Sequence, residues 1–317
     1  MLVFDLGGTH IRAAWFNAGK LEPVVRANTP HGSLSEDGPR HLTLALKAAG
    51  EEAAAGRSPP AVGLAFPGPI TANDSLLAPT AGMRGPAGSL SELRASMAEA
   101  WPGAEVAIIN DVSAAGYHFV ERGRGDFVVI NVGSGIGNKI FLDGKPVVGP
   151  NGRGGEIGHW RIPSDHYAWL DCDCGGSGHL GAISSGRGCL KVGRRMASRL
   201  ADGAAASALT SEGLVAAFHQ GERWAVESIE RAAEPLGGVI AAIHLATGIE
   251  EFILVGGFAR ILADGYRRIV VAAAADHCWN IGQDWDRMIT IGEDETGPLL
   301  GMAYYLQHVA RGPNARS

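Results

Sequence analysis

The sequence predicts an α/β protein with two lobes. In the first hundred residues, short apolar runs typical of strands alternate with helical patterns. A second cycle of the same kind begins near residue 127, and both cycles open alike, as strand, glycine turn and strand. The length of 317 residues also exceeds that of the usual single domain, so two lobes around a central cleft are expected.

The elements of the first cycle follow from the spacing of apolar residues. A short continuous apolar run favours a strand, whereas apolar residues recurring at helical intervals favour a helix. These patterns predict strands at residues 2–5, 11–16, 61–66 and 106–109 and a helix near residues 42–55.

The second cycle is predicted by the same criteria. Its first two strands fold about a glycine turn at residues 133–135. The predicted strands are 127–132, 136–142, 252–255 and 288–291, and the predicted helices lie near 190–200, 223–247, after Gly257 and at 298–309. Residues 151–188 interrupt the alternation because they are rich in Gly, His, Cys and Ser. Long loops of this kind usually carry function.

Composition narrows the class of protein. The net charge is −6 and the basic residues are scattered, so no basic stripe indicates a nucleic-acid partner. No apolar stretch reaches membrane-spanning length, and the chain opens on a strand without a leader, so a cytoplasmic location is expected. Cys172 and Cys174 form a Cys-x-Cys pair, while Cys189 and Cys278 are isolated. In a reducing compartment such a pair indicates metal ligation before disulfides.

The segment Asp5-Leu6-Gly7-Gly8-Thr9 lies between two predicted strands. Its glycines allow a tight turn in which backbone N–H groups and the Thr9 hydroxyl face an anion such as phosphate. Asp5 is then placed to hold a metal-bound water. The alternative is an ordinary hairpin turn with a solvated aspartate, because the pattern is short.

A second glycine turn supports the phosphate-binding interpretation. Its sequence is Gly133-Ser134-Gly135-Ile136-Gly137. Donors from both sides of a cleft hold a triphosphate best, so two turns of one kind favour this function. Gly256-Gly257 also follows a strand and precedes a helix, which lets backbone approach a ligand at a helix N-terminus. Taken alone, that last pattern is common in α/β proteins.

Asn110-Asp111 follows the strand at residues 106–109 and opens a helix. A carboxylate is thereby placed at a sheet edge, where ligands gather in open α/β folds. Phosphoryl transfer needs mainly positioning and charge neutralisation, together with one carboxylate that accepts the proton of the attacking hydroxyl. Asp111 is the candidate base. An N-cap role for Asp111 is the structural alternative, and the two roles are compatible.

Taken in order along the chain, these motifs resemble the ROK family of sugar kinases and related repressors. The matching segments are Asp5-Leu6-Gly7-Gly8-Thr9, Pro67-Gly68-Pro69, Asn110-Asp111, the turn at 133–137, Gly155-Glu156-Ile157-Gly158-His159 and Cys172-x-Cys174-Gly175-x-x-Gly178. The last two match the distinctive signature of that family, GH followed by CxCGxxGCxE, and the resemblance spans nearly the whole chain. It implies an actin-like ATPase (ribonuclease H-like) fold, in which sugar and ATP meet in the cleft between two lobes.

The resemblance implies a role for each matched position. Asp111 would activate the primary, C6-type hydroxyl of the sugar, and Asn110 would bind the neighbouring ring hydroxyls. Glu156 and His159 would hold the other end of the ring. The nucleotide contacts would come from Asp5, Gly7, Gly8, Thr9, Gly133, Ser134, Gly135, Gly256 and Gly257. Magnesium is implied together with ATP, because it bridges and neutralises the phosphates.

A structural zinc site is also implied by the resemblance. His159, Cys172 and Cys174 match three of the four ligands, and His179 stands where the fourth, usually cysteine, would be. Imidazole replaces thiolate in tetrahedral zinc sites, so a Cys2His2 site is expected. The alternative is that this lineage has lost the metal, and the segment from His159 to Cys172 is longer than the family pattern.

Two positions depart from the family pattern. Gly181 stands where the signature has its final glutamate, which in relatives binds the sugar near its anomeric end. Because an unmatched buried polar group is costly, a modified hexose or a C7 cyclitol is favoured over glucose, unless Asp165 or Asp171 substitutes for that glutamate. Lys139 follows the second turn, where relatives often have glycine. It would either contact a phosphate or lie on the surface, and the surface is expected.

The predicted activity is therefore ATP-dependent phosphorylation of glucose or a glucose-like substrate, such as an aminohexose or a C7 cyclitol. A repressor of the same family would carry a helix-turn-helix before the Asp5 loop, where no room for one is expected. A non-catalytic sugar sensor would keep the site for binding alone, and Asp111 argues against that alternative. The expected lobes are residues 1–110 with 298–317, and residues 111–297 with a zinc-loop insert near 151–188. The resemblance suggests a homodimer.

Overall fold

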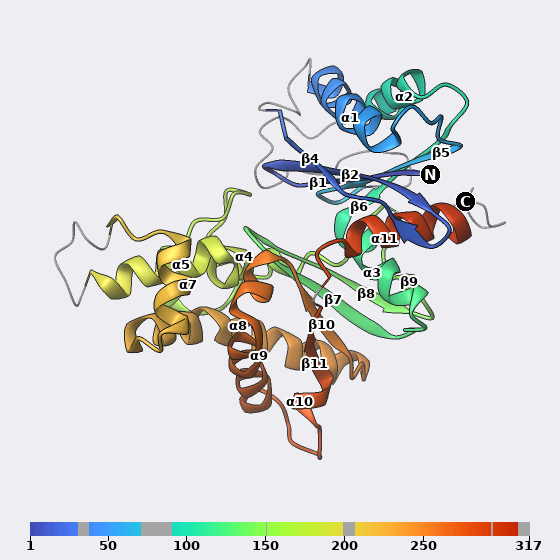
Figure 1. Ribbon diagram of the computed structural model, residues 1–317. Helices are drawn as coiled ribbons and strands as arrows, with labels where there is room; N and C mark the ends of the chain where they lie inside the picture. Colours follow the sequence, from blue (N-terminus) through green and yellow to red (C-terminus); the bar gives the residue numbers. More distant parts are fainter. Residues whose placement is uncertain (31–37, 71–90, 150, 199–206, 293, 310–317) are drawn as a thin grey trace. The chain divides into compact units, whose positions relative to one another are not determined.

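The computed structural model describes residues 1–30, 38–70, 91–149, 151–198, 207–292 and 294–309. Figure 1 labels the helices and strands. The chain divides into two compact units. The first consists of Met1–Gly125, Leu142–Gly154 and Thr296–Ser317, and the second of Asp126–Phe141 and Gly155–Glu295.

The first sheet has the order β3-β2-β1-β5-β6, with β4 paired to β2. Its strands are β1 (Leu2–Leu6), β2 (His10–Asn17), β3 (Lys20–Leu21), β4 (Val25–Asn28), β5 (Ala61–Phe66) and β6 (Glu105–Asn110). β1 and β2 form an antiparallel hairpin, whereas β1, β5 and β6 run parallel. The carboxyl ends of these three parallel strands therefore lie at one edge of the sheet.

Helices cover both faces of the first sheet. They are α1 (Gly38–Ala54), α2 (Ser91–Ala100), α3 (Asp111–Glu121) and α11 (Gly297–Tyr304), and α11 continues as a π-helical turn, η3 (Tyr305–Val309). Alternate residues of a strand point to opposite faces. Leu2 and Phe4 accordingly pack with the apolar residues of α1 and α2, while Val3 packs with those of α3 and α11. Figure 1 shows the sheet between these two helix pairs.

α3 and α11 cross closely at Gly301. A Cβ atom at this position would lie 1.7 Å from the carbonyl oxygen of Ala114, so the crossing requires glycine. This packing groups α3 with the first unit, whereas the sequence-based division assigned residues 111–297 to the other lobe. Of the small lobe expected from the sequence, residues 31–37, 71–90 and 310–317 lie outside the described residues.

The second sheet has the order β11-β10-β7-β8-β9. Its strands are β7 (Phe127–Val132), β8 (Ile136–Leu142), β9 (Lys145–Pro146), β10 (Phe252–Val255) and β11 (Ile289–Ile291). β7 and β8 form an antiparallel hairpin, and β7, β10 and β11 run parallel. Both sheets thus contain a strand, a glycine turn and an antiparallel strand, followed by parallel neighbours.

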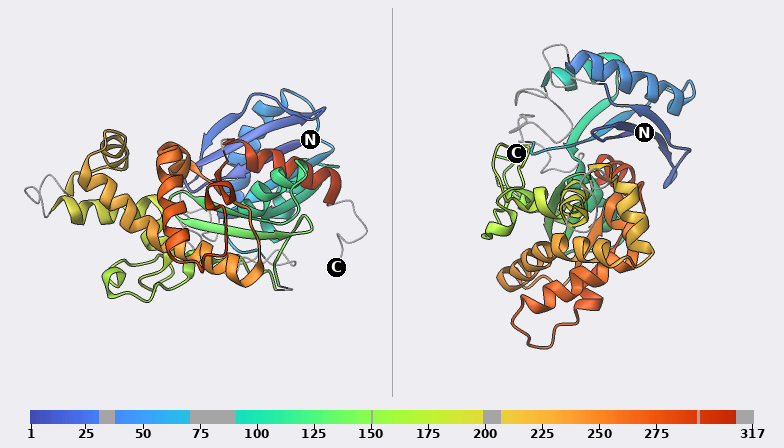
Figure 2. Two further views of the ribbon diagram at one scale, coloured as in Figure 1. Left: turned by 90° about the horizontal axis from the view of Figure 1, so that it is seen from below. Right: turned by 90° about the vertical axis from the view of Figure 1, so that its left-hand side faces the viewer.

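Helices of the second unit pack against β7 and against one another. The helices are α4 (Leu180–Ser184), α5 (Gly186–Ala197), α7 (Ser211–His219), α8 (Arg223–Thr247), α9 (Gly257–Asp276) and α10 (Trp285–Met288). Val128 and Ile130 of β7 share one core cluster with Leu236 and Ile240 of α8. α8 packs against α9, and Figure 2 draws both helices in shades of orange. Residues 151–179, all described, form only the short 3-10 turns η1 (Ile157–His159) and η2 (Asp165–Tyr167) besides isolated bridges.

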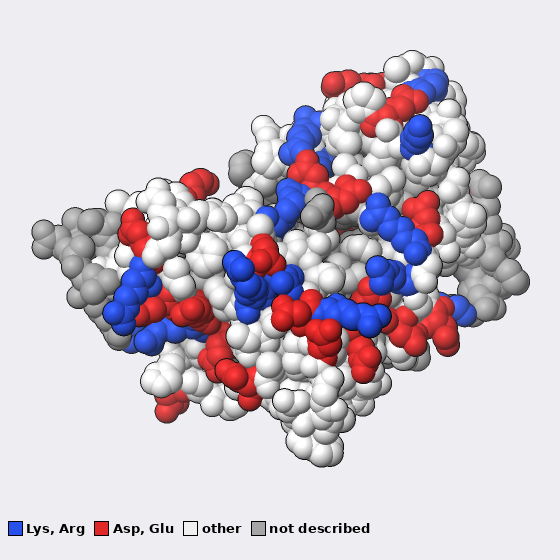
Figure 3. All heavy atoms as spheres, turned by 60° about the horizontal axis from the view of Figure 1, so that its bottom comes forward, with Lys and Arg blue, Asp and Glu red and all other residues white. Residues whose placement is uncertain are grey.

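Among the residues that the structure describes, no helix is both long and apolar enough to cross a bilayer. On the face drawn in Figure 3, Lys and Arg side chains are interspersed with Asp and Glu side chains. This surface matches the scattered basic residues of the sequence.

Candidate functional site

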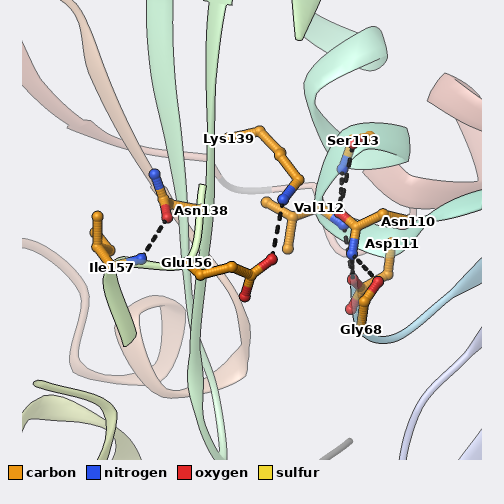
Figure 4. A network of polar contacts seen from close by, with 9 residues as sticks. All are labelled: Gly68, Asn110, Asp111, Val112, Ser113, Asn138, Lys139, Glu156 and Ile157. Carbon is orange, nitrogen blue, oxygen red and sulfur yellow. Dashed lines mark hydrogen bonds and ion pairs between the residues drawn. The ribbon is translucent and has the colours of Figure 1, made fainter. Parts of the chain in front are cut away.

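In the first unit, the predicted polar residues gather at the carboxyl edge of the sheet. Asp5 lies near the end of β1, and Asn110 ends β6 opposite Phe66 of β5. The side chain of Asn110 donates from Nδ2 to the carbonyl oxygen of Gly68 at 2.9 Å. The loop after β5 is therefore tied to the end of β6, as Figure 4 shows.

Asn110, not Asp111, caps α3. Oδ1 of Asn110 accepts a hydrogen bond from the backbone N–H of Ser113 at 3.0 Å, the usual N-cap contact. Asp111 is the first residue of the helix, and its Oδ1 accepts from the backbone N–H of Val112 at 2.9 Å and from Nδ2 of Asn110 at 3.0 Å. The alternative in which Asp111 caps the helix is thus wrong. Its carboxylate is instead held by two donors at the positive end of the helix dipole (Figure 4).

The first glycine turn is closed by nearby residues of the hairpins. Gly7 donates its N–H to the carbonyl of His10 at 2.8 Å. Thr29, directly after β4, donates its hydroxyl to the carbonyl of Gly7 at 2.8 Å and its N–H to the carbonyl of Thr9 at 3.0 Å. Gly8 and Thr9 are exposed. The carbonyl oxygens of Gly7 and Thr9 are thus bonded to protein donors.

Asp5 forms an ion pair with Arg12, which faces it across the β1–β2 hairpin. Nε of Arg12 donates to Oδ2 of Asp5 at 2.8 Å. A buried carboxylate requires a charged or hydrogen-bonding partner, and Asp5 is buried. The guanidinium of Arg12 supplies one that sequence reasoning had not assigned.

The second glycine turn is held by hydrogen bonds from α5, a helix that is distant in the sequence. The carbonyl of Gly133 accepts the N–H of Gly186 at 2.8 Å, and the carbonyl of Ser134 accepts Nε of Arg187 at 2.7 Å. Both donors lie in the first turn of α5. Within the turn itself, Gly133 donates its N–H to the carbonyl of Gly135 at 3.0 Å.

Gly256 lies beside the second turn because β10 pairs with β7, with Val255 opposite Asn131. Gly256 has φ +98°, and a Cβ atom there would lie 2.2 Å from Oδ1 of Asn131 and 2.7 Å from the carbonyl oxygen of Val132. Glycine is required at this position. Gly257, the first residue of α9, has no such neighbour within 4 Å.

Lys139 is buried, so its expected surface position is wrong. Its side chain is 3% exposed, and Nζ lies 3.3 Å from Oε1 of Glu156, whose side chain is 38% exposed. A buried ammonium needs an anionic partner, and Glu156 provides one (Figure 4). Asn138 ties the same strand to η1, since its Oδ1 accepts from the N–H of Ile157 at 3.0 Å.

The backbone around Gly181 is closely packed. A Cβ atom on Gly181 would lie 3.0 Å from the carbonyl oxygen of Gly158, and one on Gly158 would lie 2.2 Å from that of Ile136. A glutamate at position 181 would therefore require the backbone of η1 to shift. Asp165 and Asp171, the candidates to replace that glutamate, are exposed.

Four predicted ligands converge in the second unit. One donor atom from each of His159, Cys172, Cys174 and His179 lies within 4.8 Å of the others. Sγ of Cys174 is 3.3 Å from Nδ1 of His179, and Sγ of Cys172 is 3.8 Å from Nδ1 of His159. Tetrahedral zinc with ordinary Zn–S and Zn–N bonds separates such donors by about 3.5 Å. The donor set fits zinc in both chemistry and spacing.

Two of these ligands have pKa values shifted by their surroundings. Burial raises the pKa of the Cys172 thiol, and the neighbouring Cys174 thiol adds to the effect. Burial and the charges of His159 and Arg161 lower the pKa of His179. A neutral imidazole is the metal-binding form, and a desolvated thiolate is stabilised by a bound cation.

Short backbone ladders bring the ligands together. Asp171 and Ser177 form an antiparallel bridge, which folds the Cys172–Cys174 segment into a hairpin, and Arg161 bridges to His179. The His179 ring packs against Gly176, where a Cβ atom would lie 2.6 Å from Cε1, so a larger residue at this position would require the ring to move.

Sequence reasoning missed the residues that hold the two turns. These are Thr29, Gly186 and Arg187, which donate to backbone carbonyls. Hydrogen bonds to backbone carbonyls of distant residues leave no recognisable motif in the sequence. The one available signal is the four-residue spacing of Arg187, Lys191 and Arg195, which places three basic side chains on one face of a helix.

Comparisons with known proteins agree on one family. The profile of the ROK family matches residues 1–308. The chain is 34% identical to a C(7)-cyclitol 7-kinase of Streptomyces hygroscopicus subsp. jinggangensis, over 95% of this chain and 91% of that protein. Among solved structures, a ROK hexokinase from Thermus thermophilus matches with a TM-score of 0.71 and 25% identity, covering 97% of this chain and 99% of the other. A ROK family glucokinase from Streptomyces griseus, solved with glucose and AMPPNP, matches with a TM-score of 0.73 and 23% identity over 95% and 97% of the two chains.

The structural matches confirm the fold class predicted from the sequence. The two sheets, each opened by a glycine-turn hairpin, are those of the actin-like ATPase fold.

Proposed function

Because the chain belongs to the ROK family, we propose that it is an ATP-dependent kinase acting on the primary hydroxyl of a glucose-like polyol, and specifically of a C7 cyclitol. The observation that carries the proposal is the carboxylate of Asp111, held by two donors at the carboxyl edge of the first sheet. The cyclitol is favoured because a relative that matches over 95% of this chain is named a C(7)-cyclitol 7-kinase.

In this proposal Asp111 accepts the proton of the attacking hydroxyl. The hydrogen bonds from Val112 and Asn110 fix the direction of its Oδ1, and fixed positioning is the main contribution that a protein makes to phosphoryl transfer. Asn110, Glu156 and His159 would bind the other hydroxyls of the substrate.

The two glycine turns and Gly256-Gly257 would hold the nucleotide. In both turns, carbonyl oxygens that would repel phosphate oxygens are bonded to protein donors. Asp5 would orient a water of the magnesium ion, and Arg12 keeps that carboxylate in place. Bound magnesium would neutralise phosphate charge.

The Lys139–Glu156 pair supports a modified substrate. Glu156, which in the family pattern binds the ring, is already paired with a buried cation, and Gly181 removes the second carboxylate. A site with less unpaired negative charge makes fewer hydrogen bonds to the hydroxyls of an unmodified hexose.

Replacing Asp111 tests the proposed chemistry. We expect Asp111→Asn to lower kcat by about 10³-fold, the scale of general base catalysis, with substrate affinity by calorimetry nearly unchanged. Asp276→Asn, an exposed position at the end of α9, is the matched control and should keep full activity. A near-normal kcat for Asp111→Asn would refute the assignment.

A substrate panel tests the specificity. Turnover of C7 cyclitols, aminohexoses and glucose would be compared by ADP release, and the phosphorylated position assigned by NMR. We expect the highest kcat/KM with a C7 cyclitol. A clear preference for glucose would reject the modified substrate while leaving the kinase assignment intact.

The zinc site, a homodimer and a cytoplasmic location complete the proposal. His159, Cys172, Cys174 and His179 would hold zinc, which would stabilise the fold of residues 159–179. Metal analysis of protein purified without chelator should give about one equivalent per chain. Light scattering would establish the oligomeric state.

A further inference from the structure

Helix α5 presents three basic side chains to residues 159–179, which we call the metal loop. Arg187, Lys191 and Arg195 are four residues apart and so lie on one face of the helix. The contacts are Nη2 of Arg187 to Oδ2 of Asp173 at 2.6 Å, Nζ of Lys191 to the carbonyl of Asp171 at 3.4 Å, and the guanidinium of Arg195 over the ring of Trp169 at 4.6 Å. The contacted residues, 173, 171 and 169, follow one another in the direction opposite to that of the helix. The three basic side chains therefore align the metal loop antiparallel to α5.

Arg187 makes a second contact that the other two do not. While Nη2 bonds to Asp173, Nε donates to the carbonyl of Ser134 in the second glycine turn at 2.7 Å. Gly186, the preceding residue, donates its N–H to Gly133 at 2.8 Å. One guanidinium therefore joins the metal loop to the glycine turn.

Asp173 lies between two of the metal ligands, Cys172 and Cys174. A metal bound by both neighbours fixes the backbone on either side of Asp173. The Arg187 side chain is half-exposed, and an exposed ion pair contributes little unless its partners are already ordered. A bound metal supplies that order for Asp173, and the fixed guanidinium in turn holds the carbonyl of Ser134.

We propose that Arg187 is a positioning residue that couples the metal loop to the second glycine turn, so that metal binding raises the affinity for nucleotide. This inference rests on the proposed function, because it assigns that turn to the phosphates. Arg187 itself touches no reacting atom in this scheme.

The test measures nucleotide affinity with and without zinc. The Kd of AMPPNP would be determined by calorimetry for zinc-loaded and chelator-treated protein, with zinc content measured by mass spectrometry. For the wild type, we expect metal removal to weaken binding about fivefold, a coupling of ~1 kcal/mol. Arg187→Met should weaken binding about fivefold in the loaded protein and leave a metal dependence below about twofold.

Lys191→Met is the matched control, because Lys191 contacts the metal loop but not the turn. It should keep the metal dependence of the wild type. The inference is overturned if Arg187→Met keeps that dependence as well, if the wild type has none, or if the protein binds no zinc.

A second variant avoids metal removal, which can unfold the metal loop. In zinc-loaded protein, Asp173→Asn should weaken AMPPNP binding as Arg187→Met does, and the double variant should be no weaker than either single one. Additive effects would overturn the coupling. Failure of the wild type to bind nucleotide in any metal state would overturn the proposed function as well, whereas normal binding with additive variants rejects this inference alone.

Discussion

The two glycine turns have the same local form but different supports. The first is closed by Thr29, a residue of the same group of hairpins. The second is held by Gly186 and Arg187, which belong to a helix beyond the metal loop. The first turn therefore depends on its own sheet, and the second depends on the packing of a distant segment. Two glycine turns with similar sequences are therefore expected to respond differently to changes elsewhere in the protein.

Gly256→Ala should break the second turn and leave the first intact. Its Cβ atom would overlap Oδ1 of Asn131 and the carbonyl of Val132 at a positive φ, so we expect a loss of about 3 kcal/mol in the free energy of unfolding. Chemical denaturation gives the loss, and hydrogen exchange should show weaker protection in β7 and β10 but unchanged protection in β1 and β2.

Gly257→Ala is the control for that substitution. It lies one residue further along the chain, where a Cβ atom has no such neighbour within 4 Å. Its stability should stay within about 0.5 kcal/mol of the wild type. Equal stabilities of the two variants would contradict the packing described for Gly256.

Thr29→Val should weaken the first turn by a smaller amount. The change keeps the shape of the side chain but removes the hydroxyl that donates to Gly7, so a cost of about 1 kcal/mol is expected. AMPPNP affinity should fall to a similar degree with zinc present and with zinc removed, unlike the effect of Arg187→Met.

Thr247→Val provides the comparison, because it removes a hydroxyl that donates to the carbonyl of Ile243 within α8. It should leave AMPPNP affinity unchanged. An effect of Thr29→Val that appears only with zinc present would show that the first turn also depends on the metal loop.

The smallest expected effect is that of His179→Cys on the number of protons released when zinc binds. Because burial and the charges of His159 and Arg161 lower the pKa of His179, this ring is neutral near pH 7 and loses no proton on binding metal. A cysteine there, with an ordinary pKa of about 8.5, is mostly protonated and must lose one. The variant should release about one more proton per zinc at pH 7. Calorimetry in buffers of different ionisation enthalpy measures the number of protons released. Equal proton release by the wild type and the variant would contradict the assignment of His179 as a ligand.

The buried strands could be predicted from the sequence because they are continuous apolar runs. Residues 61–66, 127–132 and 252–255 form β5, β7 and β10 with the expected bounds. β3 and β4 were missed, because β3 is only Lys20–Leu21 and β4 contains Arg26 and Asn28, so neither carries an apolar run of its own. They form by pairing with β2.

The candidate site was predictable where a local motif carries it. The Cys172-x-Cys174 pair indicated metal ligation, the resemblance to the ROK family implied His159 and His179 as the other two ligands, and the four donor atoms do converge. The burial of Lys139 was not predictable, because lysine is almost always exposed and its partner Glu156 lies 17 residues further along the chain. The sequence could not distinguish Asn110 from Asp111 as the N-cap of α3, because Asn and Asp both cap helices well.

The crossing of α3 and α11 has a consequence for the order in which the protein is made. α3, which begins at Asp111, is covered by α11, whose Gly301 meets it at Ala114. On the ribosome the chain emerges from its N-terminus, so the part of α3 that packs against α11 has no cover until residues 297–304 have left the exit tunnel. A nascent chain would thus complete its second sheet before the helix carrying Asp111 is fully packed.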